Sequence, residues 1–298
     1  MDSHTTQLSE SLIDEMVRAV GLPTTKFTHA LFWRLFHRIT HRLANLGAPF
    51  DQIVRDEGLP AASAWALTHF CNPVQVRDTE HIPSDGPLLV VSNHPGTYDA
   101  FSIFSHLLRQ DIHLVSSEIP FFDLLANTRK QIFFASRKDS SNRMLVLRNA
   151  IRHLRQGGAL VYFGAGHLDP DPAVFHGAAE AIDGWLDVFD VFFKYVQGLR
   201  VLPTVVSGVV TRYWAHHPLT WLRRKQIDRH RLAQFGQVIS QLLHPGKLMV
   251  TPAVTFGVPV TENDLRQEVG DGKLLPAVIA RGKSLLLKHC SEFGGWAA

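Results

Sequence analysis

From about residue 75 onward, short apolar runs alternate with helical patterns, and this alternation restricts the chain to few folds. The runs are Leu88–Val91, Ile112–Val115, Ile132–Ala135, Ala159–Phe163, Val201–Val206 and Leu248–Phe256. The clearest helix between them is Ser141–Arg155, with Ser140 or Ser141 expected as its cap and Gly157-Gly158 as its stop. Such alternation is typical of strands covered by helices. We therefore predict an α/β fold with a mainly parallel sheet flanked by helices and an N-terminal helical extension.

The first part of the chain has a different pattern. Residues 10 to about 70 are predicted to form helices separated by three breakers, which are Gly21-Leu22-Pro23, Gly47-Ala48-Pro49 and Gly58-Leu59-Pro60. We therefore divide the chain into an N-terminal helical segment, residues 1–75, and a main domain, residues 76–298.

The segment Phe27–Leu46 is predicted to be an amphipathic helix. Its apolar face holds Leu31, Phe32, Leu35, Phe36, Ile39, Leu43 and Leu46, and the opposite side holds Arg34, His37, Arg38 and His41. Two interpretations remain open. The helix packs on the main domain and exposes its basic face to water, or it lies in a membrane interface.

Composition favours a folded protein without a metal or a disulfide framework. Of 298 residues, 45% are hydrophobic and 19% are charged. The net charge of +3 and the pI near 9.0 tilt mildly towards acidic partners such as phosphate, anionic lipid or an acidic carrier. Cys71 and Cys290 lie far apart, which fits a reducing compartment. No apolar run reaches the ~18 residues of a membrane span, and no secretion signal is evident, so we expect a cytoplasmic protein.

Polar or glycine residues follow three of the predicted strands directly. His94, Arg137 and Gly164 each stand just past a strand end. In parallel sheets, ligands usually bind beyond the carboxyl ends of the strands. We therefore expect these residues to lie on one edge of the sheet.

The motif after the first of these strands is Asn93-His94-Pro95-Gly96-Thr97-Tyr98-Asp99. On one continuous helix, His94 and Asp99 would point roughly 140° apart. The Pro95-Gly96 dipeptide predicts a tight turn instead, which can fold Asp99 back onto His94. An imidazole oriented in this way can take a proton from a hydroxyl or a thiol. The alternative is a pair that merely lines a loop.

Two further stretches offer contacts to a substrate. Ser136-Arg137-Lys138 follows a strand, and an arginine there can grip a phosphate; the alternative is a surface arginine paired with Asp139. Phe163-Gly164-Ala165-Gly166-His167 is a loop that a ligand could approach closely. It matches neither a dinucleotide fingerprint nor a P-loop.

In order and spacing, these blocks resemble the PlsC-like glycerol-phosphate and lysophospholipid acyltransferases. That family carries Asn-His-x-x-x-x-Asp after a strand, then an apolar run ending in Arg, then Phe-Pro-Glu-Gly-Thr-Arg, then an apolar strand containing a proline. The corresponding segments here are Asn93–Asp99, Ile132–Arg137, Phe163–Leu168 and Val201–Gly208, which includes Pro203. The resemblance covers about residues 76–210 and makes residues 76–298 the acyltransferase domain.

The third block departs from the family pattern. Gly164, Ala165 and Leu168 stand where the family has Pro, Glu and Arg, two of which are charged. In the family, these residues are thought to bind the phosphorylated acceptor, so their loss leaves Arg137 as the main inherited ligand. The nearby Asp169-Pro170-Asp171-Pro172 loop could supply a replacement carboxylate, but a rigid acidic surface loop is the favoured interpretation.

The resemblance implies acyl transfer from an acyl thioester, acyl-CoA or acyl carrier protein, to a hydroxyl of a glycerol-phosphate, a lysophospholipid or a related acceptor. His94 would be the general base, oriented by Asp99, and the start of the following helix would offer backbone amides to the oxyanion. The implied substrate-binding residues are Arg137, Lys138, Gly164, Gly166 and Pro203. Four apolar residues could line an acyl channel, Phe133, Phe134, Val205 and Val206, and the alternative for each of them is ordinary sheet core. No cofactor or metal is implied. The alternatives are a catalytically silent lipid-binding relative and a metal-dependent hydrolase.

A basic segment follows the resembling region. Residues 212–231 carry six cations, Arg212, Arg223, Arg224, Lys225, Arg229 and Arg231, with Trp214 and Trp221 among them. It could dock an anionic membrane, which would place the protein at the inner face, or an acidic acyl carrier protein. The alternative is a solvated helix face. Nucleic acid is not expected, because no recognition motif accompanies the cluster.

Overall fold

A mixed sheet of seven strands organises the part of the chain that the computed structural model describes, which is residues 9, 10, 12–14, 17, 23–118, 120–136 and 139–297. The strands are β1 (Gln75–Arg77), β2 (Leu88–Ser92), β3 (Ile112–Ser117), β4 (Ile132–Ala135), β5 (Ala159–Phe163), β6 (Arg200–Ser207) and β7 (Ala253–Phe256). Their order is β1-β7-β6-β2-β5-β3-β4. Strands β2 to β6 run parallel, β7 pairs antiparallel with β6, and β1 pairs parallel with β7. The predicted α/β class with a mainly parallel sheet is confirmed.

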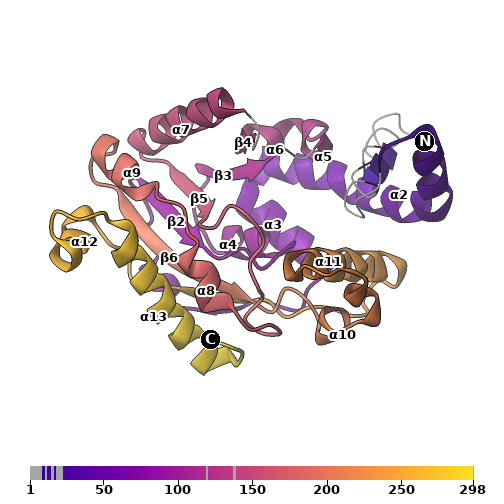
Figure 1. Ribbon diagram of the computed structural model, residues 1–298. Helices are drawn as coiled ribbons and strands as arrows, with labels where there is room; N and C mark the ends of the chain where they lie inside the picture. Colours follow the sequence, from indigo (N-terminus) through magenta and orange to yellow (C-terminus); the bar gives the residue numbers. More distant parts are fainter. Residues whose placement is uncertain are drawn as a thin grey trace.

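Helices cover both faces of this sheet (Figure 1). The helices are α2 (Lys26–Glu57), α3 (Leu59–Leu67), α4 (Asp99–Phe104), α5 (Pro120–Asp123), α6 (Ala126–Lys130), α7 (Ser140–Arg155), α8 (Ala178–Asp183), α9 (Phe189–Tyr195), α10 (Arg212–Ala215), α11 (Gln226–Leu243), α12 (Glu262–Val269) and α13 (Leu275–Phe293), with 3₁₀ turns η1 (Thr79–His81) and η2 (Pro218–Leu222). The second half of α2 packs with α3 and α4 on one face, and α7, α8, α9, α12 and α13 pack on the other.

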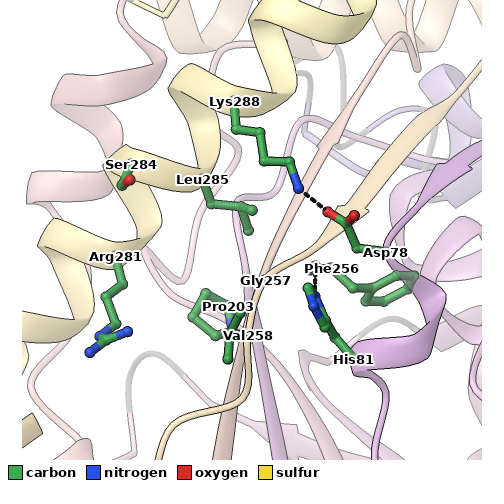
Figure 2. A pocket seen from close by; sticks show the side chains of 10 residues that line it. All are labelled: Asp78, His81, Pro203, Phe256, Gly257, Val258, Arg281, Ser284, Leu285 and Lys288. Atoms are coloured by element: carbon green, nitrogen blue, oxygen red, sulfur yellow. Dashed lines mark hydrogen bonds and ion pairs between the residues drawn. The ribbon is translucent and has the colours of Figure 1, made fainter. Parts of the chain in front are cut away.

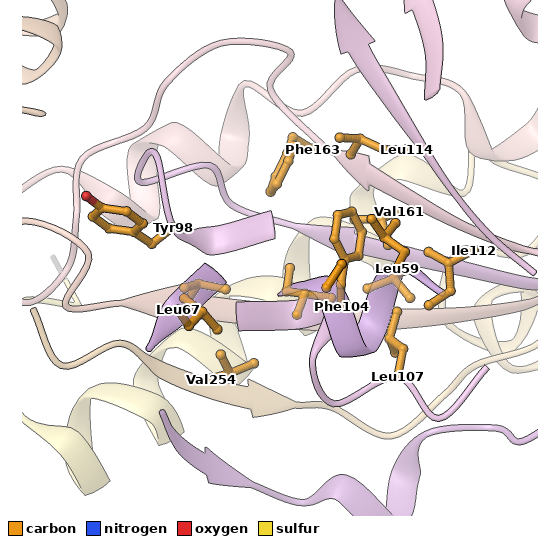
Figure 3. Close-up of a cluster of buried hydrophobic side chains, with 14 of the residues drawn as sticks. Leu59, Leu67, Tyr98, Phe104, Leu107, Ile112, Leu114, Val161, Phe163 and Val254 are labelled. Atoms are coloured by element: carbon orange, nitrogen blue, oxygen red, sulfur yellow. The ribbon is translucent and has the colours of Figure 1, made fainter. Parts of the chain in front are cut away.

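The central strand β2 shows why its sequence is apolar at every position. Leu88 and Val90 point into the core beneath α3 and α4, whereas Leu89 and Val91 point to the opposite face. All four are completely buried, because side chains alternate across a strand and both faces are covered. Figure 3 shows the first of these two cores, where side chains from α3 and α4 meet the strands.

The predicted elements differ from the observed ones at three places. The helix predicted to end before Gly47-Ala48-Pro49 continues through it to Glu57. Gly47 and Phe50 are buried there and Phe50 packs on Phe101, so tertiary packing outweighs the lost backbone hydrogen bond at the proline. The strand predicted over Leu248–Phe256 begins only at residue 253. Helix α7 is capped by Asp139, which accepts hydrogen bonds from Ser141 and Asn142, and not by Ser140 or Ser141.

The N-terminal helices share the main core. Val54 of α2 and Leu59 of α3 belong to the same buried cluster as β2 and β5. The breaker at residues 58–60 is confirmed, because Gly58 ends α2 with φ +88° and α3 begins at Leu59. Gly21 and Leu22 lie outside the described residues. The division between residues 75 and 76 stays a prediction.

The predicted amphipathic helix forms the first half of α2, and its apolar residues divide between two environments. Phe32 is buried, and it clusters with Phe36, Phe235 and Ile239 where α2 meets α11. In contrast, Leu31 and Leu35 are exposed, together with Phe27. Among the described residues, no helix combines the length and apolar content needed to cross a membrane.

Candidate active site

His94 and Gly164 follow the neighbouring strands β2 and β5, at the same edge of the sheet. The two strands end in register, with Ser92 paired to Phe163. The imidazole of His94 stacks on the Phe163 ring, with 4.2 Å between the ring centroids. The predicted convergence of these two strand ends is thus confirmed. Arg137, and with it Lys138, lies outside the described residues.

The turn at Pro95-Gly96 returns Asp99 to His94, as the sequence predicted. Nδ1 of His94 lies 2.7 Å from Oδ2 of Asp99. The carboxylate is 1% exposed, whereas the imidazole is 30% exposed. A hydrogen bond from Nδ1–H to Asp99 fixes the tautomer that leaves the lone pair of Nε2 available to accept a proton.

Two backbone amides complete the hydrogen bonding of Asp99. Gly96 N–H donates to Oδ2 at 2.9 Å, and Ala100 N–H donates to Oδ1 at 2.6 Å. These two amides are therefore already hydrogen-bonded to the aspartate. The expectation that the start of this helix offers its amides to an oxyanion is wrong for these two residues.

The surroundings of His94 raise the pKa of its imidazole. Burial lowers the pKa of His94, but the charge and hydrogen bond of Asp99 and the charge of Asp169 outweigh it, so that the net pKa is raised above its ordinary value of 6.5. His94 is thus poised to accept a proton near neutral pH.

Asn93 is a structural element of the motif. Its side-chain amide donates to Val206 O at 2.8 Å, and its oxygen accepts from Val206 N at 2.8 Å. This pair of hydrogen bonds imitates a peptide group and extends the pairing of β2 with β6 by one residue. Asn93 therefore fixes the direction in which the chain leaves β2 for His94.

The Asp169–Pro172 loop is buried, so the interpretation as an acidic surface loop is wrong. Asp169 and Asp171 are each 1% exposed. Asp171 accepts hydrogen bonds from the amides of Gly208, Val209 and Val210 in the loop after β6. Asp169 accepts one from the amide of His94. The two carboxylates thereby tie three loops together at this edge of the sheet.

Helix α11 holds the turn from Pro95 to Tyr98 through a row of glutamines that sequence reasoning missed. Gln234 donates to Pro95 O at 2.7 Å, and Tyr98 donates from its hydroxyl to Gln241 at 2.6 Å. Gly96 has φ +152°, and a Cβ there would lie 2.3 Å from the amide of Gln234. The spacing of Gln234, Gln237 and Gln241 was a sequence signal for this role, because it places all three on one face of a helix. In the structure all three are buried.

The altered third block is largely a packing feature. A Cβ on Gly164 would lie 2.4 Å from the Trp185 ring, so glycine lets the indole pack against the loop. Ala165 is also buried, in the core beneath α13. Gly166 is exposed and has φ +65°. A charged side chain at position 165 would be costly to bury in such surroundings.

Pro203 does not lie with the His94–Asp99 pair (the dyad). It stands inside β6 and lines a cavity of about 210 Å³ with His81, Arg281 and Lys288, under α13 (Figure 2). None of the residues that line this cavity belongs to the His94–Asp99 motif or to the third block. Among the predicted site residues that the structure describes, Pro203 thus shares this cavity with none of His94, Asp99, Gly164 and Gly166.

Three of the four residues expected to line an acyl channel, Phe133, Val205 and Val206, pack in or against the sheet core. Val205 and Val206 are fully buried in the two cores, and Phe133 stacks on His113. An apolar cavity of about 180 Å³ lies elsewhere, between α2, α3, α4 and α5. Thr97 and Tyr98 of the turn after His94 line it, together with Phe50, Trp65, Ala66, Phe101 and Phe122.

The family comparison agrees with this geometry. Residues 73–184, which include the dyad, the third block and Asp169, match the model of the acyltransferase family. The chain carries an acyltransferase domain. The resemblance to acyltransferases is thus confirmed, and the protein is an acyltransferase enzyme.

The two other comparisons add no support for this assignment. No curated protein matches the chain. Among solved structures, the crystal structure of PlsC, a 1-acyl-sn-glycerophosphate (LPA) acyltransferase from Thermotoga maritima, is similar over 97% of each chain, with 17% identity and a TM-score of 0.46. The assignment of the domain rests on the family match. Among the described residues, no group of three or more His, Cys, Asp or Glu side chains could hold a metal ion.

Substitution of Gln234 tests whether α11 positions the turn. We expect Gln234→Ala to lower kcat for acyl transfer by roughly tenfold, because Pro95 and Thr97 lose their partner and the dyad loses its fixed geometry. Gln237→Ala is the matched control, since Gln237 is equally buried but bonds Thr211 and Leu248 O instead. Thermal unfolding of both variants measures the loss of stability that they share. Equal kcat values for the two variants would contradict a specific role for Gln234.

Proposed function

We propose that this acyltransferase moves a fatty acyl group from an acyl thioester to a hydroxyl of a glycerol-phosphate, a lysophospholipid or a related acceptor. The observation that carries the proposal is the His94–Asp99 pair, a buried carboxylate 2.7 Å from a partly exposed imidazole. A protein that only binds lipid gains nothing from an oriented base, which argues against the silent relative.

The chemistry requires one proton to move twice. Nε2 of His94 takes the proton from the acceptor hydroxyl while the oxygen attacks the thioester carbonyl carbon. The carbon–sulfur bond then breaks, and the leaving thiolate receives the proton from His94. Asp99 stabilises the imidazolium between the two steps. The products are an ester and a free thiol, so that the imidazole ends as it began.

The apolar cavity beside the turn is the proposed site of a fatty acyl chain. Residues of α2 and α3 line it, and so do Thr97 and Tyr98, which are three and four residues beyond His94. Its lining is aromatic and aliphatic, as expected of a site that excludes water from an alkyl chain. A chain bound there would bring its carbonyl end towards the dyad.

The acceptor contacts are proposed for Arg137 and Lys138, together with the exposed backbone at Gly166. Gly164 and Ala165 are buried by packing, so they offer no side-chain contact. Ala165 and Leu168 remove two family charges from this side of the site. The acceptor therefore depends on fewer ionic contacts, and the assay must include unphosphorylated acceptors.

A thiol-release assay with a long-chain acyl thioester tests the function. We expect release with glycerol 3-phosphate, a lysophosphatidate or an unphosphorylated lyso-lipid, and we expect His94→Ala to lower it by at least about 10²–10⁴-fold, the worth of general-base catalysis. His106→Ala is the control, because His106 lies just beyond α4 and its ring, among the residues that the structure describes, bonds Ser102 and Ser105 of its own turn. Binding of lipid without release for any acceptor would favour the silent relative. Retained release in His94→Ala would contradict the mechanism.

Filling the cavity should change the preferred chain length. Ala66 lines the cavity and Ala64 is exposed on the same helix. We expect Ala66→Phe to lower kcat/KM for long-chain thioesters by roughly tenfold relative to short-chain thioesters, because the ring occupies the space of several methylenes. Ala64→Phe should leave the ratio unchanged. A uniform loss over all chain lengths in Ala66→Phe would place the acyl chain elsewhere.

The basic segment is proposed to dock on an anionic membrane. Trp221 and Leu222 of η2 are 67% and 76% exposed, and Arg224 and Lys225 beside them are exposed as well. Exposed apolar side chains next to cations suit the interface of an anionic bilayer. An acidic carrier protein would engage the cations but has less use for the apolar pair. Trp214, in contrast, is half-buried and bonds Ser240.

Co-sedimentation with vesicles tests the docking proposal. We expect binding to phosphatidylglycerol vesicles but not to phosphatidylcholine vesicles, and we expect Arg224→Gln with Lys225→Gln to weaken it about 30-fold, since each cation near the surface is worth about 1 kcal/mol. Arg152→Gln with Arg155→Gln removes the same charge from α7 and should have little effect. Figure 1 shows α7 far from α11, the helix on which η2 packs. Equal binding to both kinds of vesicle, or none, would contradict the proposal.

A further inference from the structure

Asp169 and His94 share a reciprocal pair of hydrogen bonds. Oδ2 of Asp169 accepts the backbone N–H of His94 at 2.8 Å, and the backbone N–H of Asp169 donates to His94 O at 2.8 Å. Both main-chain polar groups of the histidine are thus held by one residue that lies 75 positions away in the sequence. Asp99 orients the ring of His94, whereas Asp169 fixes its backbone.

The other oxygen of Asp169 has no hydrogen-bond partner among the described residues. Oδ1 is buried, and the Nδ1 atom of His167 lies 3.7 Å from it. A buried carboxylate oxygen without a hydrogen bond is costly. Such a cost persists in a functional site when the charge itself has a use.

Asp169 stands just after the block in which the chain has lost charge. Ala165 is buried in an apolar core, and Leu168 replaces a cation. The loop thus has an uncharged residue at position 165, which faces the core, and a buried carboxylate at position 169, which bonds the backbone of the histidine.

We propose that Asp169 is a positioning residue for His94, holding the backbone of the histidine and supplying a second negative charge beside the imidazole. This inference rests on the proposed function, in which His94 is the base. The residue acts through His94, because its own oxygens are buried away from any substrate.

The charge of Asp169 changes within the range of an enzyme assay. Burial raises the pKa of Asp169 to about 6, against the opposing effects of the hydrogen bond from His94 and the charges of His94 and His167. The charged groups that face it are His94, His167 and Asp99. Above this pH, the ionised carboxylate favours the imidazolium of His94, so that removing it must lower the pKa of His94.

Asp169→Asn separates the two contributions. The asparagine keeps an oxygen that can accept the His94 amide but loses the charge. We expect its kcat to fall by less than about tenfold. We also expect the acid limb of kcat/KM to move to lower pH than in the wild type, because the charge of Asp169 helps to raise the pKa of His94. Asp169→Ala loses the acceptor as well, and we expect its kcat to fall roughly 100-fold.

Asp171→Asn is the matched control for a merely structural role. Asp171 lies in the same loop and is equally buried, but its carboxylate bonds the loop after β6 instead of His94. We expect it to lower the melting temperature without moving the acid limb. Circular dichroism of all three variants identifies any that fail to fold.

Histidine NMR keeps this test independent of activity. The Cε1–H resonance of His94 is assigned by its loss in His94→Gln and titrated in the wild type and in Asp169→Asn. A lower pKa of His94 in Asp169→Asn supports the proposal even if no acyl transfer is found, in which case only the proposed function fails. An unchanged titration, or a wild-type kcat in Asp169→Ala, overturns it.

Discussion

The structure depends on the hydrogen bonds that satisfy the buried turn after β2. A chain that leaves a parallel strand for a tight turn exposes backbone groups that a core would leave unpaired. Here Asn93 pairs with β6, Asp169 pairs with His94 and Gln234 pairs with Pro95. Each partner comes from a different part of the chain. The turn after β2 is therefore hydrogen-bonded by β6, the Asp169 loop and α11 together.

Three different residues therefore fix His94 and the turn after it. Asp99 bonds the ring of His94 and Asp169 bonds its backbone. Gln234 bonds the turn that follows. A general base must be fixed within a fraction of an ångström to assist proton transfer. Rigid support from three directions leaves only Nε2 open to the substrate side, where the imidazole is partly exposed.

The sequence was informative where the chemistry and the fold are local. The apolar runs placed β2, β4 and β5 almost residue for residue, and the Pro95-Gly96 turn returned Asp99 to His94 as expected. Three features could not be predicted in this way. Helix α2 passes through Pro49 because Phe50 is buried against α4, the acyl-sized cavity is built by distant helices, and Asp169 is buried under a histidine 75 residues earlier. Each depends on long-range packing, which no local pattern records.

The loss of charge in the third block and the burial of Asp169 are two sides of one constraint. Gly164 lets Trp185 pack against the loop, and this packing buries Ala165 in the core beneath α13. A glutamate at position 165 would then have to give up its hydration without a partner. Four residues further on, a shorter carboxylate can be buried, because it receives the His94 amide. Packing around Trp185 therefore decides where a negative charge can stand, and the position it permits is the one beside the base.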